Sequence, residues 1–273
     1  MCEDEKMFCL TTPFGSRHST VMAATFASFA FLFLGGPAQA AGCLFEQQGG
    51  GRVAEIADAH TLHLEDGRDI SLAGIEPVVS NAKADSKAAL ATIVAGHEVT
   101  LRSQDDTPDR YGREPGFVFL RGSDTPVQVA LLSEGAALVA ADVADKDCEA
   151  LLTAAEASAR RDKRGFWADP AAIKNAESPG DILTGIGRFT VVEGRVLSVR
   201  QAGATTYLNF GRNWRREFAV TIPRRILPAF ETAGIVLKSL ENQKIRVRGF
   251  IETRGGPRIE ALRVGQIELL GRD

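Results

Sequence analysis

Short segments of alternating apolar and polar residues, bounded by turn residues, dominate the chain from residue 50 to residue 169. Alternation with a period of two is typical of strands that bury one face. We expect strands over residues 52–57, 61–64, 99–102 and 116–120, and a buried strand that runs into a loop within residues 70–79. A hairpin turn is expected at Asp66-Gly67 and a polar loop over 103–113.

Three segments between and after these strands have helical spacing instead. Residues 80–95 predict a helix with Ser80 as its N-cap, and Pro126 opens a second helix that runs to Glu134. Residues 148–164 predict a third helix, followed by a basic turn. Five strands with one inserted helix and two following helices predict a barrel of the OB type.

The alternating pattern resumes after a break. Residues 170–186 are rich in Ala, Pro, Asn, Ser and Gly and predict a linker. From 187 to 273 the pattern again favours short strands, with one helix over 225–233 between the third and fourth strands. The predicted fold is therefore mainly β with α, an OB barrel with three helices followed by a second OB-like barrel.

The first 40 residues differ from the rest in composition. Arg17 precedes an apolar run over 21–36, and Ala38-Gln39-Ala40 follows, which predicts a signal peptide over residues 1–40 and a secreted or periplasmic protein. An uncleaved membrane anchor is an alternative, although the run is short for a bilayer span, and lipidation of Cys43 is another. After cleavage no transmembrane segment is expected.

Charge and cysteine content narrow the possibilities further. The formal net charge is −3 and becomes −2 once residues 1–40 are removed, so any nucleic-acid surface must be a local patch. Cys43 and Cys148 then remain, and in an oxidising compartment they are expected to form one disulfide worth roughly 4 kcal/mol. Two buried thiols are the alternative, and no His and Cys spacing predicts a zinc site.

Residues 50–169 resemble the thermonuclease, or staphylococcal-nuclease-like, family. Five short motifs carry the resemblance in order: Asp58-Ala59-His60-Thr61, residues 66–76, Asp109-Arg110-Tyr111-Gly112-Arg113, residues 131–137, and residues 154–167. The second unit resembles the C-terminal OB-like extension of some secreted members, through residues 207–211, Trp214 and Gly256-Pro257.

The resemblance implies cleavage of DNA and RNA phosphodiesters with calcium, two phosphate-binding arginines and a carboxylate that orients water. His60 lies where the first metal carboxylate belongs, and Ser71 lies where the first arginine belongs. The water-orienting carboxylate falls on Val79. Arg113 remains as the second arginine and Glu76 as the second metal acid, and each lost charge typically costs about 10²–10³ in rate.

Two functional hypotheses follow from this comparison. The first is a degenerate nuclease site, a pseudoenzyme without cofactor that binds single-stranded nucleic acid or an envelope protein. The second is a weak calcium-dependent phosphodiesterase that uses Arg113 and Glu76 as residual catalytic residues. His60 and His63 are not expected to share a metal, because positions three apart in a strand face opposite sides.

Basic and aromatic residues mark two candidate nucleic-acid surfaces. The candidates are Tyr111 in the first unit and Arg212, Trp214 and Arg215 in the second. The alternative for the second stretch is structural: Tyr207, Phe210 and Phe218 fill the barrel, and the arginines form a solvated hairpin tip.

Overall fold

The computed structural model describes residues 42–43, 45–78, 85–103, 107–213 and 215–271. These described residues belong to one compact unit. The predicted signal peptide lies outside the described residues. Of the helices within the described ranges, none has the length and apolar character needed to cross a bilayer.

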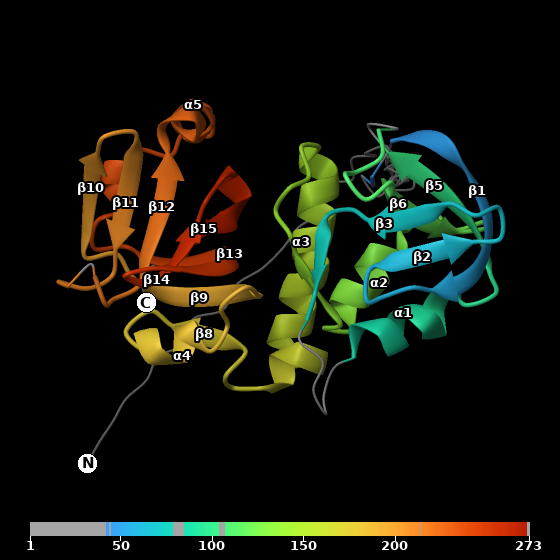
Figure 1. The fold of residues 1–273 in the computed structure, drawn as a ribbon, viewed down its shortest axis with the longest axis horizontal. Coiled ribbons are helices and arrows are strands. Elements are labelled where there is room, and N and C mark those ends of the chain that lie inside the picture. The colour runs from blue at the N-terminus through green and yellow to red at the C-terminus, as the bar shows by residue number, and fades with distance from the viewer. Residues whose placement is uncertain (1–41, 44, 79–84, 104–106, 214, 272–273) are drawn as a thin grey trace, which may run out of the picture. The chain divides into compact units, whose positions relative to one another are not determined.

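The first half of the described chain forms a closed five-stranded barrel in the order β1-β2-β3-β6-β5 (Figure 1). Neighbouring strands are antiparallel except β3 and β6, which are parallel. This confirms the predicted OB-type barrel. Its strands are β1 (Glu46–Ile56), β2 (Thr61–Leu64), β3 (Asp69–Leu72), β5 (Glu98–Ser103) and β6 (Glu114–Leu120). A separate two-stranded sheet pairs β4 (Ile75–Pro77) with β7 (Ala137–Val139).

Three α-helices accompany this barrel: α1 (Ser86–Val94), α2 (Val127–Ser133) and α3 (Lys146–Arg161). The predicted N-cap Ser80 lies outside the described residues. Asp85 caps α1 instead, since its carboxylate accepts a hydrogen bond from the Ala88 amide. Asp145 caps α3 in the same way through the Cys148 amide, so α3 begins earlier than predicted.

A disulfide joins Cys43, ahead of β1, to Cys148 in the first turn of α3, as the sequence predicts. Both cysteines are buried in the apolar core of the first barrel. The bond ties the start of the described chain to the helix that follows the barrel, across a separation of 105 residues.

The second half forms an eight-stranded sheet in the order β10-β11-β12-β14-β13-β9-β8, with β15 paired to β13 (Figure 1). Its strands are β8 (Ile173–Asn175), β9 (Phe189–Arg195), β10 (Ser198–Ala202), β11 (Thr205–Asn209), β12 (Ala219–Pro223), β13 (Lys244–Arg254), β14 (Gly256–Glu260) and β15 (Ile267–Leu269). Short helices complete it: η1 (Gly165–Ala168), α4 (Pro179–Leu183), η2 (Arg224–Ile226), α5 (Leu227–Thr232), η3 (Leu237–Leu240) and η4 (Val264–Gln266).

This sheet repeats the strand order of the first barrel if β9 and β10 are counted as one bent strand. The bend lies at Val196-Leu197, where the Val196 amide bonds toward Gln243 and the Leu197 amide bonds toward Asn209. β12 and β14 are parallel, as β3 and β6 are, and α5 lies between the third and fourth strands. Gly194 lies inside β9, where a Cβ would collide with Ala176 and Phe210.

The segment 170–186, predicted as a linker, contains regular structure. β8 pairs in parallel with β9, and α4 follows it. Ala176 and Ile182 are buried in the second apolar core. Its small and turn-forming residues therefore serve tight packing against the sheet, which composition alone does not distinguish from a free linker.

One buried ion pair connects the two halves. Glu156 on α3 is fully buried, and its carboxylate accepts hydrogen bonds from Arg248 on β13 at 2.9 Å through each of two guanidinium nitrogens. It also accepts the Val139 amide, and Arg248 donates to the Val139 carbonyl. A small apolar cluster beside the pair contains Ala159, Trp167 and Val191. The ion pair is thus satisfied by atoms of α3, β7 and β13 together.

Replacing both cysteines, Cys43→Ala with Cys148→Ala, is expected to lower the free energy of unfolding by about 4 kcal/mol. The reason is the large loop that the bond closes in the unfolded chain. Urea unfolding of the parent and the variant measures the difference. A reductant should shift the parent's midpoint toward the variant's and leave the variant unchanged; equal midpoints without reductant would contradict the prediction.

The variant Glu156→Gln is expected to lower the free energy of unfolding by about 3–5 kcal/mol, because Arg248 would keep a buried charge without its counter-ion. Glu98→Gln is the matched control. Glu98 pairs with Arg121 at the exposed surface, so its loss should cost under about 1 kcal/mol. If urea unfolding showed a similar loss of unfolding free energy for the two variants, the buried pair would contribute no more to stability than the exposed pair.

Candidate functional site

Arg113 lies directly before β6 and is held by groups from two parts of the first barrel. Its guanidinium contacts the Asp109 carboxylate at 2.8–2.9 Å and donates to the Thr61 hydroxyl at 3.1 Å. Asp109 also accepts the backbone amides of Tyr111 and Arg113, which closes a tight turn through Gly112 at φ +80°. Arg113 is therefore fixed in place before any ligand arrives.

Tyr111 projects from the same turn. Its side chain is 68% exposed, and the guanidinium groups of Arg110 and Arg113 lie 4.8 Å and 5.3 Å from the centre of its ring. An exposed ring flanked by two cations is a surface on which a base can stack while its phosphate meets a positive charge.

Ser71, which the resemblance aligns with the first phosphate-binding arginine of the family, lies beside this group. Ser71 on β3 pairs in register with Thr61 on β2, and Thr61 is the residue to which Arg113 donates. The structure therefore places the Ser71 position next to the anchored Arg113.

The two histidines of this region have different partners. The His60 ring and amide both contact the Asp58 carboxylate, at 3.1 Å and 2.8 Å, within the turn between β1 and β2. His63 pairs with Asp69 across β2 and β3. Burial alone would raise the pKa of Asp58. The pKa nevertheless lies below its usual range, because the His60 amide, the charge of His60 and the Thr61 hydroxyl favour the ionised carboxylate. Asp58 and His60 therefore bind each other.

Residues 77–169 match the family model described as staphylococcal nuclease homologue. This part of the chain is a staphylococcal nuclease homologue domain. The match covers about a third of the chain and includes Arg113, Tyr111 and α3. It does not include β1–β3, and therefore neither His60, in the turn between β1 and β2, nor Ser71 on β3. A search of the curated proteins finds no match.

Calcium, which the family resemblance implies, does not fit the residues that the resemblance assigns to its site. No group of three His, Cys, Asp or Glu side chains in the described part of the chain is placed to hold a metal ion. Calcium takes six to eight oxygen ligands, whereas His60 offers a nitrogen and its neighbour Asp58 is engaged by it. Val79, the position of the water-orienting carboxylate, lies outside the described residues.

Glu76 lies on β4, paired with Leu138 of β7. Within the described residues no hydrogen bond or ion pair joins it to Arg113, so the structure does not bring the two residual catalytic candidates into contact. Burial, and then the nearby Asp142 carboxylate, raises the pKa of Glu76 to about 7. A carboxyl group that is still partly protonated at neutral pH is a weaker ligand for a hard cation than a fully ionised one.

The second candidate surface lies on β10, β11 and the hairpin that follows. Phe210 and Phe218 are buried in the second core, as the structural alternative predicts, but Tyr207 is only half-buried and faces a pocket of about 700 Å³. Arg212 lines the same pocket, Arg215 is exposed at the hairpin tip, and Trp214 lies outside the described residues.

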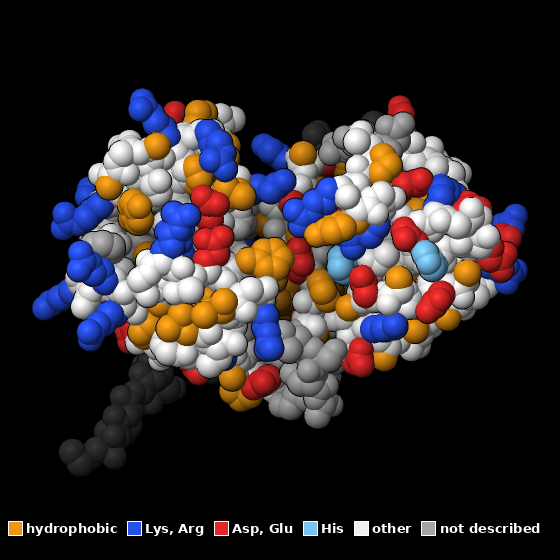
Figure 2. Space-filling view, in the orientation of Figure 1, with side chains coloured by type: hydrophobic (Ala, Val, Ile, Leu, Met, Phe, Trp, Pro, Cys, Tyr) orange, Lys and Arg blue, Asp and Glu red, His pale blue; other side chains and the backbone are white. Residues whose placement is uncertain are grey.

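The distribution of charge along the chain is a signal that the overall composition conceals. Residues 187–273 contain 16 Lys and Arg and 8 Asp and Glu, a formal net charge of +8. Residues 41–186 contain 14 and 24, a net charge of −10. Figure 2 shows Lys and Arg side chains along the outer edge of the part formed by β10 and β11. Counting charge for each half of the chain separately reveals this basic half.

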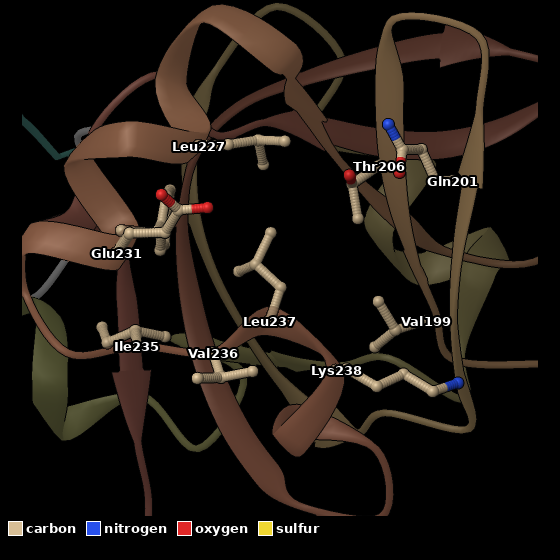
Figure 3. A pocket seen from close by; sticks show the side chains of 10 residues that line it. Val199, Gln201, Thr206, Leu227, Glu231, Ile235, Val236, Leu237 and Lys238 are labelled. Carbon is tan, nitrogen blue, oxygen red and sulfur yellow. The ribbon is translucent and has the colours of Figure 1, made fainter.

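A further cavity of about 370 Å³ lies beside α5 (Figure 3). Its walls are mainly apolar and include Val199, Leu227 and Leu237, whose side chains point into it, while Glu231 lies at the edge. Lys238, also at the edge, pairs with Glu241. No local sequence pattern predicts this cavity, because its walls come from separate elements that only the fold brings together.

Replacing the titrating acid, Glu76→Gln, is expected to change how stability depends on pH. The carboxyl pKa is raised in the folded chain, so Glu76 favours folding most at low pH, and this contribution falls as pH rises from about 4.5 to 7. The total fall is at most about 3 kcal/mol. Urea unfolding at pH 5 and pH 8 should show a smaller loss of stability in the variant than in the parent.

The control for this prediction is Glu98→Gln, which removes an exposed acid from β5. It should keep the parent's pH dependence. If Glu76→Gln kept it as well, the Glu76 carboxyl would titrate in its ordinary range.

Proposed function

We propose that this protein is a secreted, periplasmic binding protein that holds single-stranded nucleic acid and does not cleave it efficiently. The observation that carries the proposal is the pairing of Arg113 with Thr61, beside Ser71. The reaction of the family needs two guanidinium groups at one phosphate, and at this place the described part of the chain offers only the guanidinium of Arg113. Arg113 can still bind a phosphate, because it is anchored by Asp109 and flanked by the exposed Tyr111 ring.

Phosphodiester cleavage needs charge placed where it develops in the transition state. Binding alone needs only a cation and a stacking surface, and both remain at Tyr111 and Arg113. Lost catalytic charges reduce the rate strongly, about 10²–10³ for one such group, while a bound strand keeps most of its contacts. The arrangement therefore supports binding more than turnover.

The basic second half supports the choice of nucleic acid as partner. Residues 187–273 carry a formal net charge of +8, which favours a polyanionic ligand over a cationic one. The disulfide between Cys43 and Cys148 supports the secreted location, because such bonds persist in oxidising compartments.

Incubation of the purified protein with labelled single-stranded DNA should give binding without calcium-dependent cleavage, even at high protein concentration. The affinity should fall as salt rises, because phosphate contacts release counter-ions. The variant Arg113→Ala should bind more weakly, with a salt slope smaller by about 0.7 for the lost phosphate contact. Arg121→Ala, which removes an exposed arginine from the end of β6, is the matched control and should keep the parent slope.

Two results would overturn the proposal. Calcium-dependent cutting that Arg113→Ala abolishes and Arg121→Ala retains would establish the alternative, a weak phosphodiesterase that acts through Arg113 and Glu76. A protein that neither cuts nor binds strands at low salt would exclude nucleic acid as its partner and favour a protein of the envelope.

A further inference from the structure

The pocket on the second sheet is built from cross-strand pairs of the β10–β11 hairpin. Arg200 lies opposite Tyr207, and Ser198 lies opposite Asn209, so the four side chains share one face. On β11, Leu208 stands between Tyr207 and Asn209. Its side chain is fully buried in the core and faces the opposite side of the sheet. Alternation along the strand therefore holds Tyr207 and Asn209 toward the pocket.

The pocket floor is ordered and partly apolar. Asn209 is buried and donates to the Ser198 hydroxyl at 3.3 Å, which fixes the middle of the pocket. Leu197, at the bend between β9 and β10, is 45% exposed beside it. A volume of about 700 Å³ lies within the range of small-molecule sites.

Two cations lie along this pocket, Arg200 beside the Tyr207 ring and Arg212 beyond Asn209. In the described part of the chain neither guanidinium has an ion-pair or hydrogen-bond partner, and both side chains are exposed. The neighbouring acids have closer partners: Glu217 accepts the Asn213 amide, and Glu241 pairs with Lys238, although the charge of Arg200 also helps to hold the pKa of Glu241 below its usual range. Neither arginine forms a close ion pair with these acids, so both guanidiniums can still face an anion in the pocket.

We propose that this pocket binds one nucleotide unit, with its base stacked on Tyr207 and its flanking phosphates at Arg200 and Arg212. A half-buried aromatic ring between two unpaired guanidiniums matches a ligand that is planar and anionic at once. Asn209 and Ser198 offer hydrogen bonds to a base edge or a sugar between them. The proposal rests on the proposed binding of single strands and places the main contact on the second half of the chain.

A free nucleotide and a nucleotide within a strand share this chemistry. A strand offers a phosphate on each side of the base, so it can reach both arginines, whereas a mononucleotide offers one end only. Adenosine monophosphate and a short labelled deoxyadenosine strand are therefore the two probes. Equal affinity would identify free nucleotides as the occupant, and tighter binding of the strand would identify the polymer; either result supports the pocket.

The test compares four substitutions in the full protein by fluorescence anisotropy with the labelled strand. Tyr207→Leu should weaken binding about 5- to 150-fold, the range for loss of one stacked base, with an unchanged salt slope. Tyr207→Phe keeps the ring and should bind as the parent does. Arg200→Gln should reduce the salt slope by about 0.7 for one lost phosphate contact. Arg225→Gln, an equal change of charge at the exposed η2, is the matched control and should keep the parent slope.

The pocket is excluded if Tyr207→Leu and Arg200→Gln bind the strand with the parent's affinity and slope while the protein still binds. That result would leave the proposed function standing, with the strand held elsewhere. If the parent protein binds no strand and no mononucleotide, both proposals fail. Retained parent melting temperatures show that the variants are folded, and the Tyr207→Phe and Tyr207→Leu pair separates loss of the ring from loss of the fold.

Discussion

The buried carboxylate of Glu156 is the group on which the arrangement of the molecule depends. A charge without solvent must have its partners in place, and here they come from β7, from β13 and from Arg160 on its own helix. β7 in turn pairs with β4, which carries Glu76, and β13 lies between β14 and β9 in the second sheet. One ion pair therefore couples the element next to the strand of Glu76 to the sheet that carries the basic pocket.

Much of the fold could be predicted from local pattern, because each strand of the first barrel alternates and each turn has its own residues. The period of two in 61–64 and the turn at Asp66-Gly67 are local signals that tertiary contacts reinforce. The segment 170–186 could not be predicted in this way. Its order comes from burial of Ala176 and Ile182 against strands distant in sequence, and small residues at such contacts look like linker residues.

In the candidate site, too, local features could be predicted and contacts between distant segments could not. Tyr111 and Arg113 were found because a turn and a short motif place them together. The anchoring of Arg113 on Thr61 depends on a contact across 52 residues, and no local pattern encodes it. The buried partnership of Glu156 with Arg248 was missed for a similar reason. An acid in the middle of an amphipathic helix is ordinary in sequence, and only the approach of β13 makes it buried.

The opposite charges of the two halves bear on why binding and cleavage would separate in this chain. A polyanion approaching the first half would meet a formal net charge of −10 around the anchored Arg113. Over the second half it would meet a formal net charge of +8, with Arg200 and Arg212 exposed at the pocket. Long-range attraction raises the local concentration of a charged ligand at the surface of opposite sign, so the proposed strand would be steered toward β10 and β11 first. Under that field, binding would depend on the basic sheet more than on the single arginine of the first half.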